Sequence, residues 1–223
     1  MPIIETTEDA RSVGSIALER DARELLGHVM AFVAVTVGFA ALGAYLGRNL
    51  STVTGLVLFI VALGCVFGLH NAAAKGREQL ALGLLFGLGL LLGLGVAPVV
   101  ADFAEADPSA LWQAAGATAA FVAGFGAYGY ATRRDLTSWG RALFWALLGL
   151  IAFGLVSIFV SIPSGNIIYA VAGLAIFGAF TIFDFNRLRR APADGAVLIA
   201  ASIFLDVFNV FLLFLNLLGG QRN

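Results

Sequence analysis

Two aspartates lie in segments that are otherwise apolar. Asp184 stands in the stretch Ala-Phe-Thr-Ile-Phe-Asp-Phe-Asn at 179–186, and Asp206 is the only charged residue between positions 195 and 219. A carboxylate at the centre of a membrane-spanning helix costs at least about 2.5–3.5 kcal/mol. Each aspartate must therefore face the protein interior, water or a partner group, which makes both candidate ionisable sites. Asn209 follows Asp206 by three positions, shares its helical face and is a candidate supporting polar group.

Each aspartate also has a purely structural interpretation. Asp206 would then be a protonated acid bonded to a neighbouring helix, and Asp184 would form an interfacial ion pair with Arg187, one helical turn away. In a plain hairpin that turns near Pro192, the two carboxylates differ in depth by roughly 10 Å. Direct contact therefore requires a staggered hairpin or a non-helical start to the last span, and the residues alone leave the pairing open.

The elements that position these aspartates must be membrane helices. Of the 223 residues, 60% are hydrophobic and 12% are charged, whereas a soluble domain has about 25% charged residues. No alternating barrel pattern occurs, and a bilayer leaves no water to satisfy an open backbone. We therefore predict an all-α integral membrane protein, a bundle of seven transmembrane helices. The runs with little charge are 28–47, 52–70, 80–101, 109–131, 142–162, 166–183 and 195–219.

The basic residues predict how the chain crosses the membrane. The following lie in the N-terminal arm and the even-numbered loops: Arg11, Arg20, Arg23, Lys75, Arg77, Arg133, Arg134, Arg141, Arg187, Arg189 and Arg190. Only Arg48 and Arg222 lie on the other side. Because basic residues accumulate on the cytosolic side, we expect a cytosolic N-terminus and an outside C-terminus. Residues 1–27 form a cytosolic arm and residues 28–220 form the membrane domain.

The composition also excludes several classes. The net charge is -1 and no basic stripe is present, so we expect no nucleic-acid partner. Cys65 is the only cysteine, which excludes an intramolecular disulfide and a cysteine zinc site. Residues 1–27 do not have the pattern of a signal peptide. The near absence of lysine among the basic residues indicates a bacterium and hence its inner (cytoplasmic) membrane.

Three segments together resemble a known family. Phe-Asp-x-Asn-x-Leu at 183–188 and Leu-Asp-x-x-Asn-x-Phe at 205–211 are similar to motifs of the Bax inhibitor-1 family, the transmembrane Bax-inhibitor-motif proteins. Arg-Arg-Asp-Leu-Thr at 133–137 resembles that family's basic loop segment. The resemblance covers about residues 28–220.

The chain also departs from the family pattern. Phe183 and Phe204 stand where tyrosines are common, and residues 52–69 lack an acidic residue that some relatives carry.

The resemblance implies a pH-sensitive leak for calcium ions. The family's paired aspartates correspond to Asp184 and Asp206, which would sense pH, gate the path and hold calcium weakly and transiently. Lys75, or next Arg77, would be the counter-ion, although Lys75 is equally well explained as a cytosolic-side charge. Two carboxylates that share a site cannot both ionise cheaply, so they share a proton, and its loss would drive the helices apart.

The sequence also allows other functions. A membrane protein that modulates a quality-control protease or a stress and cell-death pathway is the main alternative, with a membrane-protein partner. An intramembrane aspartyl protease is disfavoured because Asp206 follows Phe204-Leu205 without the glycines of such enzymes. A proton-coupled transporter lacks the expected two-half repeat. We therefore expect no enzymatic activity and no cofactor, with calcium ions and the lipid bilayer as partners.

Overall fold

Seven α-helices make up the described part of the chain, as the sequence predicts. The computed structural model describes residues 3–160, 163–192 and 195–219, with side chains from residue 22 onward except residue 158. The helices are α1 (Ile3–Leu46), α2 (Thr52–Ala74), α3 (Glu78–Ala106), α4 (Pro108–Ala131), α5 (Trp139–Phe159), α6 (Gly165–Leu188) and α7 (Ala196–Gly219). Each contains a segment long and apolar enough to cross a membrane, and the described residues contain no strand. The predicted class and the number of spans are confirmed.

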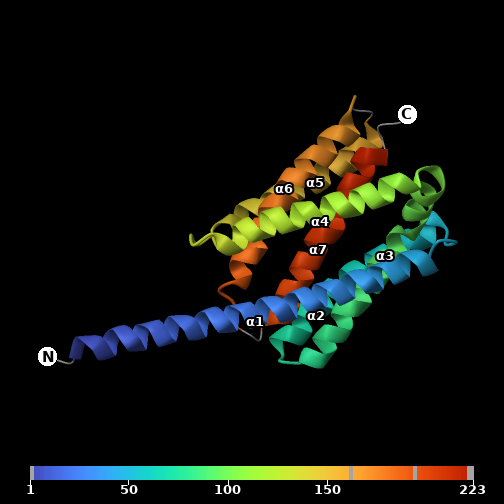
Figure 1. The fold of residues 1–223 in the computed structure, drawn as a ribbon. Coiled ribbons are helices and arrows are strands. Elements are labelled where there is room, and N and C mark those ends of the chain that lie inside the picture. The colour runs from blue at the N-terminus through green and yellow to red at the C-terminus, as the bar shows by residue number, and fades with distance from the viewer. Residues whose placement is uncertain (1–2, 161–162, 193–194, 220–223) are drawn as a thin grey trace.

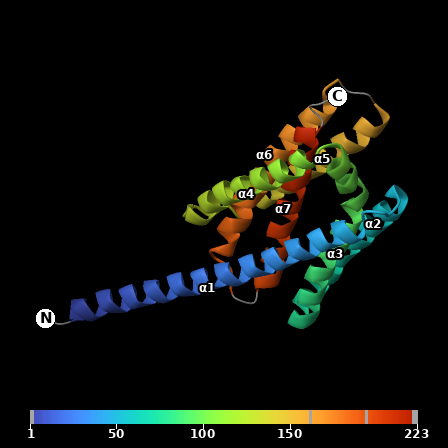
Figure 2. The same ribbon diagram turned by 45° about the vertical axis from the view of Figure 1, so that its right-hand side comes forward.

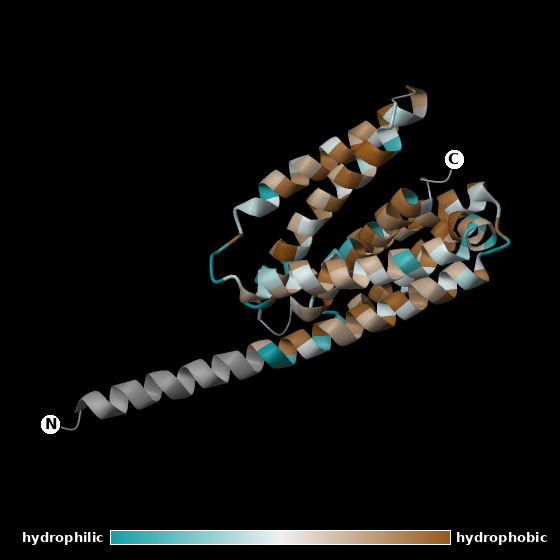
Figure 3. Cartoon of the chain, turned by 45° about the horizontal axis from the view of Figure 1, so that its top comes forward, coloured by the Kyte–Doolittle hydropathy of each residue, from teal (hydrophilic) through white to brown (hydrophobic). Residues whose placement is uncertain are grey.

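Turn chemistry explains where several helices begin and end. The Ser51 side chain accepts a hydrogen bond from the Thr54 backbone nitrogen at the start of α2, and Asp107 caps α4 ahead of Pro108, in agreement with the usual preferences for these residues. Gly76 adopts a φ of 66° between α2 and α3, a conformation that glycine permits. The charged and polar residues of these turns lie at the ends of the apolar helices (Figure 3).

Two details differ from the simplest sequence interpretation. The arm predicted at residues 1–27 is helical from Ile3 and continuous with the first span, so α1 is one helix as far as Leu46. The division at residue 27 stays a prediction. A proline inside a helix is expected to kink or end it, but Pro98 does not end α3, which continues to Ala106.

α7 lies at the centre of the bundle. It contacts α6 and α4 on one side and α1, α3 and α2 on the other, and it is the most buried of the seven candidate spans. Two views show the red α7 between the α4–α6 group and the α1–α3 group (Figures 1 and 2). A polar group on α7 is therefore shielded from lipid by both groups.

The α1–α3 group owes its close packing to glycine. A Cβ atom at Gly89 would lie 2.6 Å from the Thr36 carbonyl oxygen, and one at Gly93 would collide with the Ala40 carbonyl. The same addition at Gly83 or Gly87 would meet nothing within 4 Å. Gly83/Gly87 and Gly89/Gly93 both have the four-residue spacing of small residues that favours close helix packing, but only Gly89/Gly93 brings α3 against α1.

Candidate functional site

The two aspartates predicted as the site come from adjacent helices and are both buried. Asp184 is 5% exposed near the end of α6, and Asp206 is 4% exposed on α7. α6 packs on α7, and Asp184 lies near enough for its charge to act on Asp206. The pairing of the two aspartates stays a prediction, which their burial on adjacent helices and this charge interaction support, although their distances from the adjoining helix ends differ.

The surroundings of Asp206 leave part of its carboxyl group unsatisfied. Its Oδ2 atom is buried and has no hydrogen-bond partner. The Thr181 hydroxyl, on the α6 turn before Asp184, donates to the Phe177 carbonyl oxygen at 2.8 Å and lies close to the Asp206 carboxyl group. A buried carboxylate without full compensation is costly unless it takes up a proton or pairs with a cation.

The basic residue whose charge reaches Asp184 is Arg187, which is exposed in the last turn of α6. Lys75 and Arg77 are exposed at the α2–α3 turn. Neither forms a salt bridge, because the single salt bridge among the described side chains joins Arg190 and Asp135. The counter-ion role of Lys75 and Arg77 stays a prediction that no contact with either aspartate supports.

Asn209 does not use its amide as a partner for the aspartates. Its Nδ2 atom donates to the Leu205 carbonyl oxygen at 2.7 Å, within α7. The oxygen atoms that could serve as cation ligands at the site are the two carboxyl groups and the Thr181 hydroxyl. Calcium takes six to eight oxygen ligands, and no cluster of three or more His, Cys, Asp or Glu side chains occurs among the residues described. This set of donors fits weak rather than tight binding.

Asn186 belongs to the sequence motif at 183–188, but the sequence predicted no role for it. Its Nδ2 atom donates to the carbonyl oxygens of Thr132 (2.8 Å), Arg134 (3.1 Å) and Gly129 (3.3 Å). Its Oδ1 atom accepts from the Leu136 backbone nitrogen at 3.4 Å. Asn186 is 2% exposed. The only sequence signal was a second polar residue, two positions after Asp184, in an apolar segment.

A second set of contacts, at exposed side chains, holds residues 133–137 against the end of α6. Arg190 donates to the Arg133 carbonyl oxygen at 2.9 Å and forms the salt bridge with Asp135 at 2.8 Å. The Thr137 hydroxyl and backbone nitrogen both donate to Asp135. These Thr137 hydrogen bonds, with Arg190, hold the pKa of Asp135 below its ordinary value. The basic loop segment identified in the sequence is thus fixed to the end of α6.

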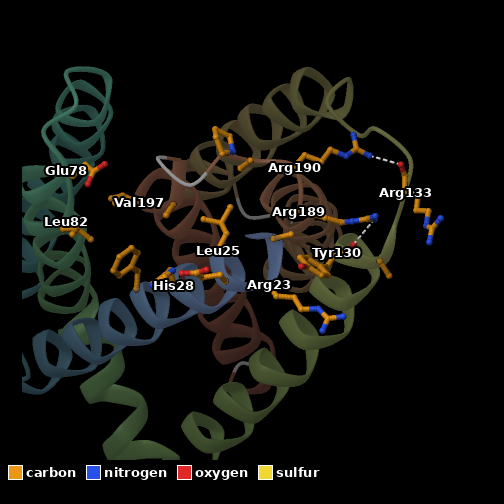
Figure 4. Close-up of a pocket in the computed structure, with 17 residues that line it drawn as sticks. Arg23, Leu25, His28, Glu78, Leu82, Tyr130, Arg133, Arg189, Arg190 and Val197 are labelled. Atoms are coloured by element: carbon orange, nitrogen blue, oxygen red, sulfur yellow. Dashed lines mark hydrogen bonds between the residues drawn. The ribbon is translucent and has the colours of Figure 1, made fainter. Parts of the chain in front are cut away.

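A cavity of about 1070 Å³ opens at the same end of the bundle, between α1, α3, α4, α6 and α7. His28 and Leu25 lie on α1, Glu78 on α3, and Arg189 and Arg190 at the end of α6 (Figure 4). Neither Asp184 nor Asp206 lines this cavity.

An apolar layer borders this cavity. Leu25, Leu188 and Val197 belong to one buried cluster. Val197 lines the cavity, and Asp206 follows it by nine positions, or about 14 Å along the helix.

A second cavity of about 690 Å³ lies near the other end of α7, between α5, α6 and α7. Its polar lining includes Ser157, Asn166, Tyr169 and Asn216. Asn216 follows Asp206 by ten positions, or about 15 Å along the helix. Asp206 is therefore roughly midway along α7 between the two cavities, whereas Asp184 lies on α6, five positions before Arg189 of the first cavity's lining.

Seven apolar helices around a buried pair of aspartates define this chain as a multi-pass membrane protein. The family model described as inhibitor of apoptosis-promoting Bax1 matches residues 22–223. The chain belongs to this family, the Bax inhibitor-1 family, as its motifs predict.

Its relatives include bacterial and animal proteins. An uncharacterized protein of Helicobacter pylori is 30% identical over 192 residues, which cover 84% of this chain and 83% of that protein. An uncharacterized membrane protein of Vibrio cholerae is 25% identical over 197 residues, 87% of each chain. Protein lifeguard 4 of Mus musculus is 31% identical over 164 residues, 73% of this chain and 67% of that protein.

Proposed function

We propose that this protein is a pH-sensitive leak for calcium ions, gated by a proton that Asp184 and Asp206 share. The observation that carries the proposal is the position of the pair. Both carboxyl groups are buried, and Asp206 lies between two cavities near opposite ends of α7. A path that joined these cavities along α7 would pass the aspartates.

The gating step follows from electrostatics at low dielectric. With a shared proton the pair carries a single negative charge, and α6 and α7 stay packed. Loss of the proton leaves two negative charges close together, where Coulomb repulsion is far stronger than in water. The repulsion favours an arrangement in which α6 and α7 separate and a cation enters. The apolar layer that contains Leu25, Leu188 and Val197 must also open for ions to pass.

Calcium suits the site as a permeant ion. Carboxylate and hydroxyl oxygens are the ligands that calcium prefers, and the site offers only a few of them. Permeation requires binding that is strong enough for entry and weak enough for release. Calcium is therefore the transported ion in this proposal, and no resident cofactor is needed.

Flux measurements test the proposal. In proteoliposomes with a calcium indicator, the wild-type protein should leak calcium faster as pH rises. Asp206→Asn should change the flux and flatten its pH dependence because the pair can no longer trade a proton. Asp102→Asn, an exposed carboxylate on α3, is the matched control and should keep the wild-type profile. Flux in Asp206→Asn that equals wild type at every pH would end the proposal.

A second function is favoured by the family description, which names inhibition of a death-promoting protein. In this function the chain would modulate a membrane-protein partner, such as a quality-control protease or a stress-pathway component. The partner would bind at the basic end of the bundle, which carries Arg133, Arg134, Arg189 and Arg190. The segment 132–138 is held in place there by Asn186 and Arg190. Co-purification of a partner that survives Asp206→Asn but is lost on deletion of residues 1–27 would support this function.

We also propose that the protein acts without catalysis, in the inner membrane of a bacterium. Bacterial relatives, one of them described as a membrane protein, support the location. Cleavage of a helical reporter that Asp184→Asn abolishes would instead indicate an aspartyl protease.

A further inference from the structure

The last turn of α6 presents two polar side chains to opposite sides. Asp184 and Asn186 are two positions apart, which places them about 200° apart around the helix at 3.6 residues per turn. Asp184 acts on Asp206 of α7, whereas Asn186 bonds α4 and the segment after it. The same helical turn therefore links the aspartate pair to residues 129–136.

The hydrogen bonds of Asn186 use both functions of its amide. A side-chain amide has two N–H donors and one carbonyl acceptor. The donors reach carbonyl oxygens at and beyond the end of α4, at Gly129, Thr132 and Arg134, where a helix leaves its carbonyls unpaired. The acceptor takes the backbone nitrogen of Leu136, which is 7% exposed. Moving this turn of α6 must break these bonds or carry the segment with it.

We propose that Asn186 is a positioning residue for the aspartate pair, through which residues 132–138 move together with the end of α6 that carries Asp184. This inference rests on the proposed function and deepens it, because it names the element through which the state of the pair is transmitted to the basic end of the bundle. Asn186 itself does not titrate. The charged groups that act on the pair from the described residues are Arg187, which acts on Asp184, and Asp184 itself, which acts on Asp206.

Coupling between two sites is reciprocal, so a change at the aspartates must alter the conformation of residues 132–138. Ser138 is an exposed reporter position whose side chain makes no capping hydrogen bond. A Ser138→Cys reporter in a Cys65→Ser background of the full chain, in liposomes, is labelled with a maleimide. Asp206→Asn should change the labelling rate about fivefold or more, the lower end of usual coupling between sites. In an Asn186→Ala background the same Asp206→Asn change should have no effect.

Asn71→Ala is the matched control, because Asn71 is an exposed asparagine on α2, away from α6 and α7 in the sequence. It should leave the response of the reporter to Asp206→Asn intact. If Asn186→Ala does not fold, Asn186→Ser replaces it. The comparison of wild type with Asp206→Asn needs no Asn186 variant, so the inference stays testable in either case.

Several results would overturn the inference. One is a reporter that labels equally with and without Asp206→Asn while Asn186 is intact, and another is a response that persists in Asn186→Ala. Where the wild type conducts calcium, Asn186→Ala should also shift the pH midpoint of flux, and an unshifted midpoint contradicts the positioning role. If Asp206→Asn changes the labelling rate of the reporter as expected but the wild type conducts no calcium, only the proposed function is overturned.

Discussion

Arg190 and Asp135 form a salt bridge of 2.8 Å between the end of α6 and the segment that follows α4. The side chains are 37% and 68% exposed, so water and salt screen the pair, and exposed pairs contribute little to stability. The Asp135 carboxylate also accepts hydrogen bonds from the Thr137 hydroxyl and backbone nitrogen. Asp135 therefore acts mainly as the acceptor that shapes the turn, and Arg190 attaches that turn to α6.

This arrangement predicts an acid dependence for Asp135→Asn. Because the Thr137 hydrogen bonds and Arg190 hold the pKa of Asp135 below its ordinary value of 3.8, the folded state prefers the ionised carboxyl group. The stabilisation is present above about pH 4 and is lost as pH falls through the lowered pKa. Asp135→Asn should therefore lower the apparent Tm slightly at pH 7, and the difference from wild type should shrink as the pH falls below about 4.

Thermal unfolding in an acid-stable detergent measures this difference. Asp102→Asn is the control, since Asp102 is exposed on α3 and forms no salt bridge with a described side chain. A difference for Asp135→Asn that grows as the pH is lowered has the wrong sign and would contradict the account.

The contact between α1 and α3 predicts opposite outcomes for two glycines of one helix. A methyl group at Gly93 would collide with the Ala40 carbonyl, whereas one at Gly87 meets nothing within 4 Å. Overpacking of this kind costs about 1–3 kcal/mol. Gly93→Ala should therefore lower the apparent Tm in detergent, while Gly87→Ala should leave it unchanged or raise it. Equal effects of the two variants would show that α3 does not approach α1 through Gly93.

These glycines illustrate what could be predicted from the sequence and what could not. Hydropathy and the cost of an unpaired charge predicted seven spans and two buried aspartates, because lipid imposes those requirements on each helix separately. The two glycine pairs of α3 have the same spacing, and only packing against α1 separates Gly93 from Gly87. Which face of a helix meets a neighbour is a property of the whole bundle.

The same reason explains the role of Asn186. Its partners are backbone groups 50 to 57 positions away, and side-chain identity does not mark a carbonyl oxygen as an acceptor. The counter-ion prediction rested on position along the chain. It favoured Lys75 and Arg77, whose role stays a prediction, and the structural interpretation of Asp184 named Arg187, whose charge reaches Asp184 from three positions away on the same helix.

The distribution of basic residues predicts the orientation of the chain. Ser138 lies in the fourth loop and Ser164 in the fifth, and both are exposed. In a Cys65→Ser background, Ser138→Cys should react with an impermeant maleimide only in inside-out vesicles, and Ser164→Cys only in right-side-out vesicles, because basic loops stay cytosolic. The reverse pattern would contradict the predicted cytosolic N-terminus.

The buried, unpartnered oxygen of Asp206 predicts that removing this carboxyl group stabilises the fold. An unsatisfied buried polar group costs about 1–3 kcal/mol, and Asp206 Oδ2 has no hydrogen-bond partner. Asp206→Leu has a similar shape and strands no other group, because the Thr181 hydroxyl keeps its bond to the Phe177 carbonyl. The apparent Tm of Asp206→Leu should therefore exceed that of wild type at neutral pH, with Asp206→Asn in between, as expected where a functional group is kept at a cost in stability. A lower Tm for Asp206→Leu, with Asp206→Asn unchanged, would instead mean that the carboxyl group holds the bundle together.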